Sequence, residues 1–381
     1  MISSTTERPS YQYMDAFRFV AATVVVLGHA KDLLWVDADE VEAGVAGVLK
    51  AVYFLTGLGH EAVMVFFVLS GFWIARSVDR RKHDDHFWRP YLVDRCSRLL
   101  VVLVPALLIG GILDGYGLMH FDSMHFGGAS PAVSVPNDLA GRLSLIAFLG
   151  NVAFLQGLAV PTFGSNGPLW SLSYEFWFYI WFPAIVFAVR GRWQIALASL
   201  AVGVIWPKVL LGFVIWLMGA GLYYADRSTI ASGRPMGRVF ATLLLLSCAG
   251  ALLIALVVAR LHIVPLAVSD IAVGGTFAGI VWALLRLDPC FPRIAQIFAL
   301  YGSRSSFSLY AIHFPLLMFV LGLTGLSDRM QPGVEAMFGL GVLVLLAIAA
   351  GWGFSLLTEA RTSNVRRWFG TVMSGRATSG R

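Results

Sequence analysis

Charged residues are scarce in this chain of 381 residues: Asp, Glu, Lys and Arg together make up 13%, whereas hydrophobic residues make up 58%. This balance excludes an ordinary soluble domain, because such a fold could not hide so much apolar surface from water. Cysteine is also rare, with three in total. Cys96 and Cys290 fall on the predicted cytoplasmic side and Cys248 within an expected helix, so no external disulfide is predicted.

The chain also lacks internal repeats, low-complexity linkers and a recognisable signal cleavage site. The first apolar run is not followed by small residues of the type that signal peptidases cleave, so we expect it to remain as the first helix. The net charge of +6 follows the loops of one membrane side, and we expect no nucleic-acid partner.

Long apolar runs are what the chain has in abundance. Runs long enough to span a bilayer lie at 14–36, 58–78, 99–118, 169–189, 192–206, 209–224, 239–259, 264–285, 305–323 and 335–357. If the short run 143–158 does not cross, 22 of the 28 Lys and Arg residues fall on one side of the membrane. By the positive-inside rule, the sequence predicts an all-α integral membrane protein, a bundle of about ten transmembrane helices with both termini cytoplasmic.

The same reading gives the domain organisation and location. We expect a cytoplasmic tail at 1–12, one transmembrane domain at 13–357 and a second cytoplasmic tail at 358–381. Residues 121–168 form one external segment that contains a re-entrant or interfacial piece. The expected location is the inner cell membrane, crossed many times.

Two ionisable residues interrupt the first apolar run, Arg18 near its start and His29 near its end. At helical rise they are about 16 Å apart, so they belong to opposite halves of the membrane. Arg18 is either a snorkelling cytoplasmic anchor or a functional cation. His29 is either a neutral imidazole satisfied by a carbonyl or a group that handles a proton.

Arg95 and Arg98 come directly before the third apolar run. Their spacing of three places both guanidinium groups on one helical face at the cytoplasmic interface. Two such groups suit a phosphate-bearing ligand, although lipid headgroups are phosphates as well.

Another polar cluster precedes and opens the run at 169–189. Asn166 or Ser165 is expected to cap this helix, and Pro168 suits its first turn. Ser171 and Glu175 follow, one turn apart on the same face. Glu175 is either a first-turn acid favoured by the helix dipole or a carboxylate that orients His29.

Two further helices carry notable residues. Ser70 and Gly71 interrupt a bulky run, and close helix packing explains them better than space for a ligand does. His313 is a second intramembrane imidazole. Because Pro315 frees backbone carbonyls that could satisfy that ring, we do not expect His313 to be catalytic.

In their order along the chain these features resemble the acyltransferase-3 family of membrane acyltransferases. The resemblance rests on Arg18 and His29, FFVLSGF at 66–72, the R-x-x-R of Arg95 and Arg98, LWSLSYEFWFY at 169–179 and SFSLYAIHFPL at 306–316. It runs from Tyr13 to about residue 357.

The resemblance implies an enzyme, an O-acyltransferase that moves an acyl group, with acetyl expected, from acyl-CoA to a hydroxyl of a glycan or glycoside. It implies that His29 and the preceding Arg18 are essential and that Arg95 and Arg98 serve the donor. Our hypothesis is that His29 acts as general base or as transient acyl carrier, and that Arg18 stabilises phosphate or carbonyl charge of the donor. Glu175 is expected to orient His29. Acyl-CoA is a co-substrate, and we expect no metal and no permanently bound cofactor.

Some members of the family carry an extracellular esterase-like domain after the helices. We expect no such domain here, because the sequence ends soon after its last apolar run, and we expect that the chain either completes the transfer itself or depends on a separate extracytoplasmic partner. A transporter or flippase for a lipid-linked glycan is the alternative, although the sequence lacks the repeats and paired broken helices typical of transporters. A catalytically inactive accessory subunit is a third reading.

Overall fold

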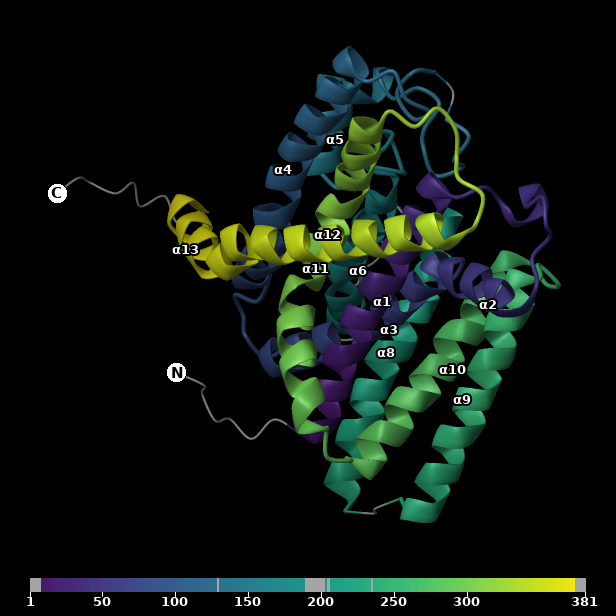
Figure 1. Ribbon diagram of the computed structural model, residues 1–381. Helices are drawn as coiled ribbons and strands as arrows, with labels where there is room; N and C mark the ends of the chain where they lie inside the picture. The colour runs from purple at the N-terminus through teal and green to yellow at the C-terminus, as the bar shows by residue number, and fades with distance from the viewer. Residues whose placement is uncertain (1–7, 129, 189–202, 204–205, 234–235, 374–381) are drawn as a thin grey trace. The chain divides into compact units, whose positions relative to one another are not determined.

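Helices dominate the computed structural model, which describes residues 8–128, 130–188, 203, 206–233 and 236–373 (Figure 1). The described residues contain no β-strand, only two isolated bridges that join Trp35 to Met330 and Gln156 to Val160. The prediction of an all-α protein is therefore confirmed. The main helices are α1 (Pro9–Leu34), α2 (Gly47–Thr56), α3 (Gly59–Arg81), α4 (Trp88–His120), α5 (Leu145–Val152), α6 (Trp170–Ala188), α8 (Pro207–Ser232), α9 (Arg238–Arg260), α10 (Leu266–Leu287), α11 (Arg293–Thr324), α12 (Val334–Leu357) and α13 (Thr362–Met373).

Membrane-spanning character is clear for much of this set. Within the described part of the chain, seven helical segments are long and apolar enough to cross a bilayer: Gly59–Arg81, Trp88–His120, Pro207–Ser232, Arg238–Arg260, Leu266–Leu287, Ala299–Thr324 and Val334–Thr371. The expected spans at 14–36 and 169–189 correspond to α1 and α6, which are 26 and 19 residues long. The expected span at 192–206 lies outside the described residues apart from positions 203 and 206.

The segment 143–158 forms only a short helix. Ser144 caps α5 by accepting a hydrogen bond from the Ala147 amide, and the helix ends after eight residues. A span needs roughly 20 residues, so α5 is too short to cross a bilayer. Asn151 fastens it to the following loop, since its side chain donates to Pro161 O and accepts from the Phe163 amide.

The chain divides into two compact units. Unit 1 comprises residues 1–21, 60–82 and 177–303, and unit 2 comprises residues 22–59, 83–176 and 304–381. The division falls within α1, α6 and α11, so each of these helices contributes residues to both units.

Unit 1 is built around a close crossing of α3 and α8. A Cβ placed on Gly71 would collide with the backbone carbonyl of Trp216, and one placed on Gly219 would collide with that of Val68. Small residues let two membrane helices bring their backbones together and so gain van der Waals contact. The packing interpretation of Gly71 is therefore confirmed. Helix α10 packs on both α8 and α9 in the same unit (Figure 1).

In unit 2, too, glycines lie where two helices come close together. A Cβ on Gly351 of α12 would lie 2.7 Å from Leu309 Cα, and one on Gly110 of α4 would lie 3.1 Å from Pro315 Cγ. Likewise, a Cβ placed on Gly28 of α1 would lie 2.7 Å from the carbonyl oxygen of Thr56. These contacts hold α4, α11 and α12 together and place the end of α2 against α1, directly beside His29.

Candidate active site

His29 lies in the C-terminal half of α1, in unit 2, and its side chain is only partly buried. Its ring stacks on that of His313 from α11, with the centroids 5.3 Å apart and the planes 27° apart. The ring of Phe314 meets His29 edge-on at 5.1 Å. The structure thus brings together the two imidazoles that the sequence places at opposite ends of the domain.

His313 is fully buried, at 0% exposure. Its Nδ1 lies 2.9 Å from the carbonyl oxygen of Tyr310 and 3.2 Å from that of Leu309. Because a carbonyl can only accept, Nδ1 carries the proton, and the lone pair of the neutral ring is on Nε2. That Nε2 has no hydrogen-bond partner in the described structure.

Tyr310 links the same part of α11 to the start of α6. Its hydroxyl donates to the carbonyl oxygen of Pro168. Since this uses its one proton, the hydroxyl of Ser171 is the donor in the 2.7 Å bond between the two hydroxyls. Glu175 lies one turn beyond Ser171 on α6 and is close enough to act electrostatically on Tyr310.

Of the two expected capping residues, Asn166 occupies the N-cap position of the short turn Gly167–Leu169 that leads into α6, but its side chain makes no capping hydrogen bond. Its amide instead donates to the carbonyl oxygen of Ala311, at 2.8 Å. Pro315 has no N–H, so the carbonyl four residues earlier, that of Ala311, has no donor within the helix. Asn166 supplies that donor, whereas Pro168 does occupy the first turn as predicted.

Asp114 of α4 is a residue that the sequence reasoning missed. It is 1% exposed, and its carboxylate accepts a hydrogen bond from the Ser165 amide at 2.7 Å. It thereby holds the segment that leads into α6. An acidic residue within the apolar run 99–118 was the signal that could have identified it.

The arginines that the sequence analysis expects to bind the acyl-CoA donor lie on α4 and α1. Arg95 is an ion-pair partner of Asp94 at 2.8 Å and lies over the ring of Tyr91. Asp94 also pairs with Arg366 of α13, at 3.0 Å, while Arg98 is exposed. Arg18 belongs to unit 1, where it pairs with Asp15 at 3.7 Å.

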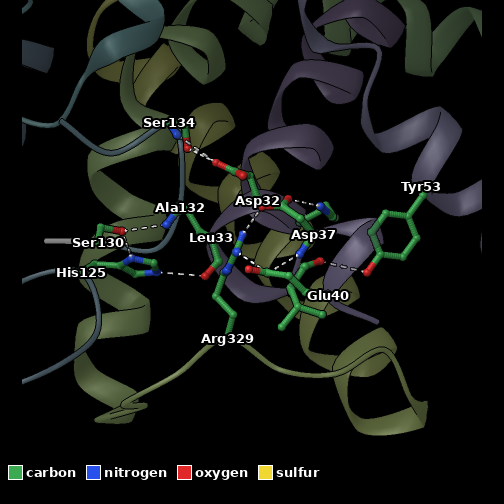
Figure 2. Close-up of polar contacts among 12 residues, drawn as sticks. Asp32, Leu33, Asp37, Glu40, Tyr53, His125, Ser130, Ala132, Ser134 and Arg329 are labelled. Carbon is green, nitrogen blue, oxygen red and sulfur yellow. Dashed lines mark hydrogen bonds and ion pairs between the residues drawn. The ribbon is translucent and has the colours of Figure 1, made fainter. Parts of the chain in front are cut away.

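A network of loops contacts the end of α1, as Figure 2 shows. His125 Nε2 donates to the carbonyl oxygen of Leu33 at 2.9 Å, and Ser130 donates to His125 Nδ1 at 2.8 Å. The amide and hydroxyl of Ser134 both donate to the carboxylate of Asp32. The last carbonyls of a helix have no partner within it, so these loops satisfy groups one turn beyond His29.

Arg329 also belongs to this network, which we call the α1 cap (residues 31–40, 125–128, 130–134 and 329–330; Figure 2). Its side chain is 4% exposed, and its guanidinium group pairs with Asp37 at 3.0 Å and with Glu40 at 2.7 Å. Burial raises the pKa of Asp37, but the hydrogen bonds and charges of Arg329 and Lys31 outweigh it and hold that pKa below its usual range. Burial lowers the pKa of His125, because the charged ring would lose hydration.

Among the residues described, no group of three or more His, Cys, Asp or Glu side chains could hold a metal ion. His29 stacks on the imidazole of His313, and one turn earlier α11 carries the Tyr310 hydroxyl that bonds to Ser171. Imidazole and hydroxyl groups can pass protons and bind hydroxyl-bearing ligands.

Comparison with known proteins assigns the chain to a class, the membrane acyltransferases. The chain belongs to the acyltransferase-3 family, whose model, described as an acyltransferase domain, matches residues 11–356. It is 33% identical over 138 residues to the acyltransferase MdmB of Streptomyces mycarofaciens. That match covers 35% of this chain and 30% of the relative, so less than a third of the relative is spanned. No solved structure matches the chain.

Proposed function

We propose that this protein transfers an acyl group, with acetyl expected, from cytoplasmic acyl-CoA to a hydroxyl of a glycan or glycoside. The observation that carries the proposal is the stacking of a partly buried His29 on His313. One turn before His313 on α11 lies Tyr310, whose hydroxyl is hydrogen-bonded to Ser171. An imidazole among buried polar groups suits the proton transfers that acylation of a hydroxyl requires. The similarity to an acyltransferase supports the same reaction class.

In this proposal His29 is the central catalytic residue. It acts either as the general base toward the acceptor hydroxyl or as a transient carrier of the acyl group. Glu175 is a positioning residue that orients His29 from α6. Overall, the acceptor oxygen forms a bond to the acyl carbon, the C–S bond of the thioester breaks, and the sulfur leaves as the thiol of CoA.

Arg95 and Arg98 would bind the phosphates of the donor, with Arg18 contributing charge from α1. Gly110 packs on Pro315, two residues from His313, and therefore marks the level of the site on α4. Twelve residues separate Arg98 from Gly110, which is about 18 Å of helix. A donor held at the arginines must reach over that length, and the long arm of CoA suits this task.

The proposed topology has about ten crossings of the inner cell membrane, with both termini cytoplasmic. Residues 13–357 would be the catalytic transmembrane domain, flanked by the tails 1–12 and 358–381. Acyl-CoA then enters from the cytoplasm, and the acceptor meets the acyl group from the external side, where a separate partner would complete the transfer if this chain does not.

The test is transfer of label from radiolabelled acetyl-CoA to membrane glycans by the purified protein. His29→Ala should lower the rate by at least about 100-fold, which is the low end of what a catalytic acid or base contributes. His262→Ala, in the loop between α9 and α10, is the matched control and should behave as wild type. Equal labelling by His29→Ala and wild type would refute the role of His29.

Donor binding has its own test, equilibrium binding of acyl-CoA. Arg95→Ala combined with Arg98→Ala should weaken affinity by about tenfold or more, because each charged fork contributes strong hydrogen bonds. Arg238→Ala, an exposed arginine at the start of α9, is the control. Unchanged affinity in the double variant would remove both residues from the donor site.

A further inference from the structure

The Nε2 atom of His313 is a buried acceptor without a partner. The ring is 0% exposed, and Nδ1 donates to the Tyr310 carbonyl oxygen at 2.9 Å, so the lone pair is on Nε2. Buried polar groups are nearly always hydrogen-bonded, and an exception calls for an explanation. A ligand hydroxyl is a donor of the kind that this atom lacks.

The position of His29 beside His313 indicates which hydroxyl this ligand would carry. His29 stacks on its ring with the centroids 5.3 Å apart, and the His29 side chain is only partly buried. Two imidazolium rings at this separation would repel each other, so the pair is suited to hold one proton at a time. A substrate that reacts at His29 therefore lies beside the imidazole of His313, whose Nε2 can accept a proton.

We propose that His313 is a second catalytic residue, the base that takes the proton of the acceptor hydroxyl at Nε2 while His29 carries the acyl group. The proposal rests on the proposed function and selects one of its two roles for His29. The carbonyl that Pro315 leaves without a helical donor is that of Ala311, and it accepts a hydrogen bond from Asn166. It is therefore not the group that pairs with the His313 ring, whose Nδ1 donates to the Tyr310 carbonyl.

The two half-reactions balance. In the first, a ring nitrogen of His29 attacks the thioester carbon, the C–S bond breaks, and the thiolate takes the proton of the other His29 nitrogen to leave as CoA thiol. In the second, the acceptor oxygen bonds to the acyl carbon and its proton moves to His313 Nε2. The C–N bond breaks, its electron pair returns to His29, and His313 passes its proton to His29, which restores both neutral rings.

His313→Asn separates this role from a structural one. The asparagine amide can still donate to the Tyr310 carbonyl, but it has no basic nitrogen at the Nε2 position. With radiolabelled acetyl-CoA we expect this variant to release a burst of about one CoA per protein, as covalent catalysis produces. Turnover with the membrane glycans that wild type labels should then fall about 100-fold or more.

Hydroxylamine is the second probe, since it attacks an acyl group without help from a base. It should restore turnover of His313→Asn and form acetyl hydroxamate faster than an enzyme-free mixture, in which hydroxylamine attacks acetyl-CoA directly. His29→Ala should give no burst and no hydroxamate above that background. His120→Asn is the matched control, because His120 is exposed and its Nδ1 makes the same type of bond, to Tyr116 O at 3.0 Å. It should show wild-type burst and turnover.

The outcomes are distinct. Wild-type glycan turnover by His313→Asn, or loss of its burst while the variant remains folded, would overturn the role of His313. Absence of CoA release and of transfer in wild type would instead overturn the proposed function. If His313→Asn does not fold, His313→Gln takes its place with the same readouts, because its amide reaches the Nε2 position and is not basic.

Discussion

At the scale of single residues, the hydrogen bond between Asn166 and Ala311 compensates for a defect that Pro315 creates. Asn166→Ala would leave the Ala311 carbonyl buried without a donor, and we expect a loss of about 1–3 kcal/mol of stability. Thermal unfolding in detergent measures this loss. Asn364→Ala, at an exposed position on α13, should stay within about 0.5 kcal/mol of wild type.

Pro315→Ala provides the internal check on that explanation. An alanine restores the helical N–H that can reach the Ala311 carbonyl, so Asn166→Ala should cost clearly less in the Pro315→Ala background than in wild type. If the two substitutions are simply additive, the bond does not compensate for the proline.

The residue scale is also where sequence reasoning reached its limit. His29 and Glu175 could be singled out because ionisable groups in apolar runs are costly. Their partners could not, since the stacking of His29 on His313 joins segments 284 positions apart in the chain, which no local pattern encodes. The same holds for Asn166, whose expected capping bond gave way to a distant carbonyl.

At the scale of helices, glycine contacts decide how α3 and α8 pack. Gly219→Ala should destabilise the protein by about 1–3 kcal/mol, because its methyl group would overlap the carbonyl of Val68. Gly221→Ala is the matched control on the same helix, since nothing lies within 4 Å of its added Cβ. Equal melting temperatures for the two variants would show that the helices can separate freely.

The stability of the α1 cap is expected to depend on pH through Asp37. A carboxylate whose pKa is lowered in the folded protein contributes stability above its unfolded pKa, and that contribution is lost as the pH falls through the folded value. Arg329→Gln should therefore destabilise the protein by roughly 1 kcal/mol at neutral pH and by progressively less below about pH 4. Melting temperatures of both proteins across this range test it. A constant difference at every pH would contradict the assignment to Asp37.

Helix positions were the most predictable part of the fold. Runs of apolar residues gave α3, α4, α8, α9, α10, α11 and α12, because the bilayer imposes a length that a sequence displays directly. The α1 cap was not predicted. Its loops 125–134 and 329–330 have no periodic pattern, and their polar residues find partners only through the folded chain.

At the scale of the whole molecule, the proposed topology predicts which loops a membrane-impermeant thiol reagent can label in intact cells. With Cys96, Cys248 and Cys290 replaced by serine, a cysteine at Asn137 should be labelled and one at Asp85 should not. Both positions are exposed, so burial does not explain a difference between them. Opening the cells should make Asp85→Cys reactive, which is the control for its accessibility. If only Asp85→Cys is labelled in intact cells, the proposed topology is the wrong way round. Arg95 and Arg98 would then lie on the external side of the membrane, where no acyl-CoA is supplied.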